Sequence, residues 1–146
     1  MNNSIVFPIK DKDFVGELIP QKFPFVMIDS LLSFSEVQII SGFTVTLDNI
    51  FVEKDVFQEA GLIEHMAQSV ALYTGFQYYL KQQPAPVGYI GSIKKVEILR
   101  LPMLGEEINT TVHIIQEFMG VTLVEISSKI NDIEIANSQM KTVLAH

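Results

Sequence analysis

The chain contains no cysteine, only one arginine and no long apolar run, and each shortage excludes a class of protein. Without cysteine there is no disulfide framework, thiolate metal site or cysteine nucleophile. No stretch of about 18 apolar residues and no leader with a charged start and an apolar centre is present, so we expect a cytoplasmic protein that does not insert into a membrane. The net charge of −7 disfavours nucleic acid as a partner, because that affinity comes mainly from Lys and Arg neutralising phosphates.

The chain has enough apolar residues to form one hydrophobic core. The 146 residues are 48% hydrophobic, and a domain of this size buries roughly two thirds of its unfolded surface. No internal repeat, low-complexity tract or Ser/Gly linker divides the chain. The sequence therefore predicts a single domain over residues 1–146.

The apolar pattern predicts two strands, a long helix and then further strands. Residues 60–80 form the helix, which ends before Pro84 and Pro86, and its apolar side chains spread around most of its circumference, as in a helix buried on nearly every side. Residues 1–20 are expected to be a lead-in and 21–25 an extended segment. The predicted strands are 25–34, 37–47, 87–100, 107–118 and 121–144, with turns at Gly105, at Gly120 and, within the last strand, at 131–132. This order predicts an α+β fold in which one sheet wraps one helix.

Glu64 is the most informative residue, because it is a carboxylate in an otherwise almost wholly apolar helix. A buried carboxylate is costly and needs a reason, and Gln68 lies four residues on, on the same helical face. A plainer explanation also stands: a glutamate near a helix start is favoured by the helix dipole and by water. His65 points about 100° away around the helix, so we expect a core or interface residue there and no Glu-His pair on one face.

The remaining candidates carry no chemistry of their own. His113 lies in a predicted strand, facing away from its apolar neighbours, and His146 is the terminus. No His, Asp and Glu cluster has metal-ligand spacing, so no metal is expected, and there is no nucleophile elbow. Gly88, Gly91 and Gly105 are too scattered for a phosphate-binding loop and are expected to be turns, bulges or close backbone approaches.

Four segments together resemble a known family. Residues 19–29 (Ile-Pro-Gln-Lys-Phe-Pro-Phe-Val-Met-Ile-Asp) and 61–68 (Gly-Leu-Ile-Glu-His-Met-Ala-Gln) are similar to the opening and the central-helix motif of the bacterial 3-hydroxyacyl-[acyl-carrier-protein] dehydratases. Residues 89–93 (Tyr-Ile-Gly-Ser-Ile) and 101–106 (Leu-Pro-Met-Leu-Gly-Glu) match later landmarks of the same family in order and spacing. The resemblance covers residues 18–144 and implies a hot-dog fold, an antiparallel sheet around one long central helix.

The resemblance implies an acyl thioester as substrate, carried on the phosphopantetheine of an acyl carrier protein, with no other cofactor. In the family a histidine takes a C2 proton, the helix carboxylate helps the C3 hydroxyl leave, and the two come from different subunits. Glu64 stands where the family has its catalytic carboxylate. The substrate-binding residues that this implies are Gln68, Phe57, Leu62, Met66 and Gly91.

The chain departs from the family where the catalytic histidine is expected, in a Gly-His-Phe-Pro segment before the helix. Residues 48–60 here contain no histidine, and in this they look more like the divergent relatives of aryl-polyene and flexirubin-type pathways. Two interpretations remain open: a homodimer with altered chemistry, or the histidine-lacking half of a heterodimer whose other hot-dog subunit bears the histidine. A non-catalytic acyl-thioester-binding subunit and a hot-dog thioesterase are the alternatives from other classes.

Two surface features complete the expectations. Lys94, Lys95 and Arg100 form a local positive cluster, which either docks an acidic carrier protein or is an ordinary solvated strand face. A single curved sheet leaves an unpaired edge, so we expect a dimer joined through sheet edges. We also expect an apolar tunnel that opens near Glu64, because acyl chains need a dry, elongated cavity.

Overall fold

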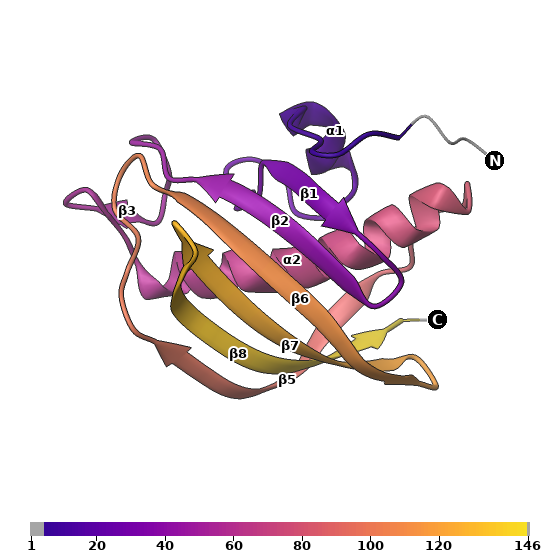
Figure 1. Cartoon of the computed structure of the whole chain (residues 1–146). Coiled ribbons are helices and arrows are strands. Elements are labelled where there is room, and N and C mark those ends of the chain that lie inside the picture. The colour runs from indigo at the N-terminus through magenta and orange to yellow at the C-terminus, as the bar shows by residue number, and fades with distance from the viewer. Residues whose placement is uncertain (1–4, 146) are drawn as a thin grey trace.

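The computed structural model describes residues 5–145, and its largest part is a six-stranded antiparallel sheet. The strands lie in the order β1-β2-β6-β7-β8-β5, so that β5 and β1 are the two edges (Figure 1). The strands are β1 (Ser30–Phe34), β2 (Gln38–Thr44), β5 (Gly88–Ile98), β6 (Glu107–Phe118), β7 (Val121–Ile130) and β8 (Ile133–Leu144). A separate small hairpin is made by β3 (Val52–Glu53) and β4 (Val56–Phe57).

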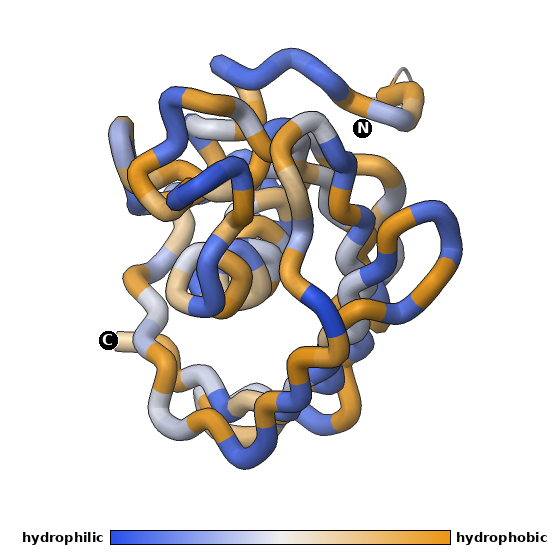
Figure 2. The backbone as a smooth tube through the Cα atoms, turned by 90° about the vertical axis from the view of Figure 1, so that its left-hand side faces the viewer, coloured by the Kyte–Doolittle hydropathy of each residue, from blue (hydrophilic) through white to orange (hydrophobic). Residues whose placement is uncertain are grey.

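The long helix α2 (Glu59–Leu80) lies across one face of this sheet, and the sheet curves around it (Figures 1 and 2). Half of its 22 residues are buried because apolar residues occur on every side of the helix, among them the fully buried Leu62, Met66 and Leu72. The helix ends at Leu80 with Lys81 as its C-cap, and the chain then turns at Gln82, which has a positive φ of 56°. The predicted helix over 60–80 and the α+β order are therefore confirmed.

The last two strands follow directly from alternation and turn residues. In β7 the side chains alternate, with Val124, Ile126 and Ser128 buried against the helix side and Glu125 exposed. The turn to β8 is Asn131-Asp132, both at positive φ (51° and 65°), a conformation that Asn and Asp tolerate better than most residues. The break predicted at 131–132 is therefore confirmed.

The N-terminal third differs from the prediction in two places. The lead-in contains a short helix, α1 (Lys12–Glu17), whose N-cap Asp11 accepts hydrogen bonds from the backbone N–H groups of Asp13 and Phe14. Residues 21–25 were expected to be extended, but the chain turns there, with Phe25 N–H donating to the Lys22 carbonyl, and β1 begins only at residue 30. Each proline restricts only its own backbone and that of the residue before it, whereas the path of residues 21–27 is determined by hydrogen bonds to helix α2, which is distant in the sequence.

Strand β5 is the feature that bears on assembly. All of its residues except Ile98 are exposed, although it is paired along its length with β8. Ile93 and Val96 stand opposite the buried Met140 and Ser138 of β8, so they face the helix side of the sheet, where α2 leaves them 45% and 37% exposed. The edge strand thus offers a free backbone edge beside an uncovered apolar row. No helix between residues 5 and 145 is long and apolar enough to cross a membrane.

Candidate functional site

Glu64 lies beyond the first turn of α2 and is half-buried. The dipole effect falls off within the first turn of a helix, where Glu59 stands exposed, so position at a helix start does not by itself account for Glu64. One carboxylate oxygen, Oε2, accepts a hydrogen bond of 2.8 Å from Nε2 of Gln68. The predicted pairing of Glu64 with Gln68 along one helical face is therefore present.

Gln68 is fully buried and every polar atom of its side chain is used. Nε2 donates to the Phe25 carbonyl at 2.7 Å as well as to Glu64, and Oε1 accepts from the backbone N–H of Met27 at 2.7 Å. The amide therefore ties the turn before β1 to the helix while it holds the carboxylate. These bonds also explain why residues 21–25 leave the extended path: the chain bends to bring Phe25 and Met27 onto Gln68.

His65 is a core residue, as predicted, and its ring points away from Glu64. It is fully buried, with Nδ1 2.6 Å from the Met27 carbonyl oxygen and Nε2 2.7 Å from Oγ1 of Thr110 on β6. Burial lowers the pKa of His65 to about 4, and the bond to the Met27 carbonyl works in the other direction without offsetting it. The ring is therefore neutral near pH 7 and is closed off from any ligand beside Glu64.

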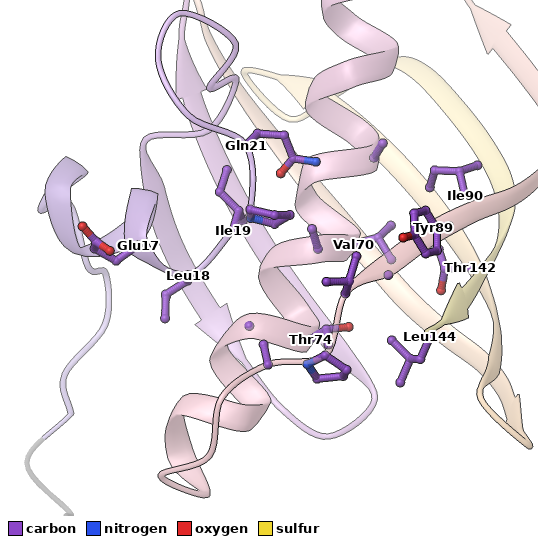
Figure 3. A pocket seen from close by; sticks show the side chains of 18 residues that line it. Glu17, Leu18, Ile19, Gln21, Val70, Thr74, Tyr89, Ile90, Thr142 and Leu144 are labelled. Atoms are coloured by element: carbon purple, nitrogen blue, oxygen red, sulfur yellow. The ribbon is translucent and has the colours of Figure 1, made fainter. Parts of the chain in front are cut away.

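A cavity of about 310 Å³ lies on the other side of the helix from the sheet centre, between α2, the chain before β1, and the start of β5 (Figure 3). Its helix wall includes Ala67, Ala71 and Thr74. Glu64 is not among the residues that line the cavity, but Ala67 is three residues from it and hence its neighbour on the helix surface. The remaining walls are residues 17–21, residues 85–90, and Thr142 and Leu144 of β8.

Gln21 contributes a polar group to this cavity (Figure 3). Its Oε1 is buried and has no hydrogen-bond partner within the described chain. A buried carbonyl oxygen without a donor is costly unless a ligand or water supplies one. The sequence signal was present, because Gln21 stands within residues 19–29, which resemble the opening of the family, but only the fold shows that its side chain meets the cavity.

The residues predicted to bind substrate fall in two places. Phe57, Leu62 and Met66 are fully buried in the core and do not line this cavity, so the predicted tunnel walls differ from those of the cavity that the structure contains. Leu62 and Met66 face the sheet, which the helical pattern alone does not reveal, and Phe57 lies in β4. Gly91 lies at a bulge in β5, between Ile90 and Ser92, where an added Cβ would stand 3.0 Å from Cγ2 of Val143. A role of these four residues in binding stays a prediction.

The predicted positive cluster is only partly free. Arg100 forms a bidentate ion pair with Glu106, in which Nη1 donates to Oε1 at 2.7 Å and Nη2 donates to Oε2 at 3.0 Å. Lys94 and Lys95 lie together on the exposed strand β5, next to a second bulge. Carrier-protein docking at these residues stays a prediction. In it the two lysines provide the positive charge, because neither forms an ion pair with a residue between 5 and 145.

Among the described residues, no histidine other than His65 lies near Glu64. His113 is exposed on the outer face of the sheet, opposite Glu125 of β7, as predicted, and His146 lies outside the described residues. In the segment where the family has its histidine, Asn49 instead closes a local turn, accepting from the Phe51 N–H at 2.8 Å. Between residues 5 and 145 there is no group of His, Asp and Glu that would hold a metal ion.

The chain is similar to known dehydratases over most of its length. A family model described as ApeP dehydratase matches residues 14–145. A 3-hydroxyacyl-[acyl-carrier-protein] dehydratase FabZ of Vibrio atlanticus strain LGP32 is 23% identical over 137 residues, covering 87% of this chain and 88% of that protein. FabZ of Yersinia enterocolitica is 25% identical over 112 residues, covering 73% of this chain and 66% of that one, just under two thirds.

Solved structures agree on the fold. The dehydratase heterocomplex ApeI:P of Xenorhabdus doucetiae includes a chain that superposes with a TM-score of 0.85 at 15% identity, covering 97% of this chain and 93% of that one. The PaaI protein of Escherichia coli, from the phenylacetic acid degradation operon, superposes with a TM-score of 0.62 at 15% identity, covering 77% and 80%. The predicted hot-dog fold, one antiparallel sheet around a central helix, is confirmed.

Proposed function

The chain belongs to the ApeP-like family of dehydratases, and from this we propose that it is the Glu64-bearing subunit of a heterodimeric dehydratase acting on 3-hydroxyacyl thioesters. The substrate is carried on the phosphopantetheine of an acyl carrier protein, and the second hot-dog subunit supplies the histidine. The protein acts in the cytoplasm. This assignment places the chain in the hydro-lyase class and gives it one half of a composite active site.

The observation that carries the proposal is a positioned carboxylate beside which residues 5–145 place no free imidazole. Glu64 is half-buried and held by Gln68, whereas His65 is closed into the core and His113 lies on the outer face of the sheet. Dehydration needs a base for the C2 proton and an acid for the leaving hydroxyl. The histidine of the second subunit takes the C2 proton as the double bond forms, and the C3–O bond breaks as the hydroxyl takes a proton from the Glu64 carboxyl group and leaves as water. The histidine is then protonated and Glu64 is a carboxylate, and proton exchange with solvent restores both.

The second subunit fits at β5. That strand has a free backbone edge and an uncovered apolar row that includes Ile93 and Val96, and such an edge is a template for pairing with another chain. The structurally similar ApeI:P of Xenorhabdus doucetiae is a dehydratase heterocomplex, which supports pairing with a different chain. The partner that we propose is a hot-dog subunit that contains the Gly-His-Phe-Pro segment missing here.

The cavity beside α2 is the proposed site of the acyl thioester. Its volume of about 310 Å³ is at the lower end of the range for small-molecule sites, which suits a chain-shaped ligand. Leu18, Val70 and Ile90 give it apolar walls, and Gln21 adds one carboxamide for the polar part of the ligand. Because Ala67 connects this wall to Glu64, a substrate lying in the cavity brings its reactive end toward the carboxylate.

The test is to produce the chain with a Gly-His-Phe-Pro hot-dog subunit from the same organism and to purify the complex. The complex is incubated with 3-hydroxyacyl thioesters of carrier protein, and loss of water is followed by mass. We expect Glu64→Gln to reduce turnover about 10²- to 10⁴-fold, because general acid–base groups contribute that much, while the bond to Gln68 and the fold persist. Glu59→Gln, on the exposed first turn of the same helix, is the matched control and should leave turnover unchanged.

Three outcomes separate the alternatives. Turnover that depends on Glu64 and on the complex supports the proposal. An active complex in which Glu64→Gln is silent identifies the chain as a non-catalytic subunit. Release of the free thiol with no loss of water identifies a thioesterase and overturns the dehydratase assignment.

A further inference from the structure

The His65 ring is a buried titratable group that the proposed chemistry does not use. It stands next to Glu64 in the sequence but occupies the core between α2, the chain before β1 and strand β6. A fully buried imidazole loses its contact with water, so its two ring nitrogens must both find partners. Both do, and the identities of these partners define the state of the ring.

The hydrogen bonds determine which nitrogen carries the proton. Nδ1 faces the Met27 carbonyl oxygen at 2.6 Å, and because a carbonyl only accepts, Nδ1 is the donor. In the neutral ring Nε2 then accepts, from the hydroxyl of Thr110 at 2.7 Å. Thr110 has a single proton to give, so its oxygen accepts in turn from the Ser128 hydroxyl at 2.7 Å. The ring is therefore anchored to the sheet on one side and donates to the Met27 carbonyl on the other.

Met27 connects this anchor to the carboxylate. Its carbonyl is held by His65, while its backbone N–H donates to Oε1 of Gln68 at 2.7 Å. Nε2 of the same amide donates to the Phe25 carbonyl at 2.7 Å and to Glu64 at 2.8 Å. A continuous series of hydrogen bonds thus runs from the sheet through His65 and Met27 to Gln68 and Glu64.

We propose that His65 is a positioning residue for Glu64: by fixing the Phe25–Met27 turn against the helix, it fixes the Gln68 amide that orients the carboxylate. If the Met27 carbonyl is released, the turn moves, and the Gln68 amide loses the two backbone groups that determine its rotamer. Glu64 then keeps its place on the helix but not its direction. The inference rests on the proposed role of Glu64, and its test has one readout that does not depend on activity.

Two substitutions separate the two sides of the ring. In His65→Asn the side-chain amide stands near the place of Nδ1 and still donates to the Met27 carbonyl. In His65→Gln the amide reaches toward the place of Nε2 and Thr110, and the bond to Met27 is lost. Both remove an aromatic ring from the core, so both are expected to lower thermal stability, and each is the control for the other.

The first readout is nuclear magnetic resonance of the chain alone, labelled with ¹⁵N at glutamine side chains. The Gln68 amide protons, assigned with Gln68→Met, are both donated inside the protein and should exchange slowly with water. We expect their protection to be kept in His65→Asn and reduced at least 10-fold in His65→Gln. Equal protection in the two folded variants would overturn the proposal.

The second readout is turnover of the complex with the histidine-bearing subunit. Misplacement of a catalytic group by about 1 Å costs as much as 10²-fold, so we expect kcat to fall 10- to 100-fold in His65→Gln, with KM within about threefold of the unchanged protein. His65→Asn should restore most of kcat. Equal losses in both variants would reduce His65 to a packing residue. If the unmodified complex shows no turnover, the proposed function fails, and amide protection alone decides the role of His65.

Discussion

Acidification between pH 7 and pH 4.5 should destabilise this protein through His65. The folded state holds the ring neutral, with its pKa lowered by burial from 6.5 to about 4, whereas the unfolded chain takes up a proton near the ordinary value. In this window the unfolded state binds more protons than the folded state. Stability contributed by the neutral ring is therefore complete above pH 6.5 and is lost as the pH falls toward 4.

The magnitude follows from the shift. Each pKa unit corresponds to about 1.4 kcal/mol, so the full effect is about 3 kcal/mol, of which roughly 2–3 kcal/mol is lost between pH 7 and pH 4.5. His65 is fully buried, so solvent screening does not reduce this figure. The groups that contact the ring, the Met27 carbonyl, the Thr110 hydroxyl and the Phe43 ring, carry no charge of their own in this range.

The assay is urea unfolding of the unmodified chain and of His65→Asn at both pH values. Asp29 also titrates with a shift, but burial raises the pKa of that carboxyl, so the folded state gains stability as the pH falls and the effect is opposite in sign. Asp29 is common to both proteins and cancels in the comparison. The unmodified chain should lose roughly 2–3 kcal/mol more than His65→Asn. Parallel losses in the two proteins would refute the conclusion that the ring is neutral and buried.

Two further predictions concern packing and assembly. Gly75→Ala should lower the free energy of unfolding in urea by roughly 1–3 kcal/mol or more, because the new Cβ would lie 1.8 Å from the Leu18 carbonyl oxygen. The control is Gly16→Ala, which has nothing within 4 Å of its new Cβ and should be neutral or stabilising by about 0.5–1 kcal/mol. Equal effects of the two substitutions would contradict the close approach of Leu18 to α2. Val96→Glu, on the apolar row of β5, should abolish the complex with the histidine-bearing subunit, as measured by light scattering. The control is Ile133→Glu, which also puts a charge in place of an exposed apolar residue but lies in β8, and it should leave the complex intact. A complex that survives Val96→Glu would exclude β5 as the interface.

Much of the fold was predictable because it rests on local chemistry. The helix over 60–80 is read from apolar residues on all its faces and from the prolines that follow, and the β7–β8 turn from Asn131 and Asp132. The pairing of Glu64 with Gln68 follows from helical geometry, since residues four apart share a face. The direction of His65 away from Glu64 follows from the same geometry.

Only the tertiary structure determined what these residues contact, because their partners are far away in the chain. Gln68 forms hydrogen bonds with Phe25 and Met27, which are 43 and 41 positions away in the sequence. These bonds hold the chain in a turn and override the local preference for an extended segment. The same holds for His65 and Thr110, 45 positions apart, and for the cavity, whose walls come from four separate parts of the chain. Periodicity shows that Leu62 and Met66 are buried, but not that they face the sheet while Ala67 and Ala71 face the cavity, since a helix buried on every side has no face that its own sequence distinguishes.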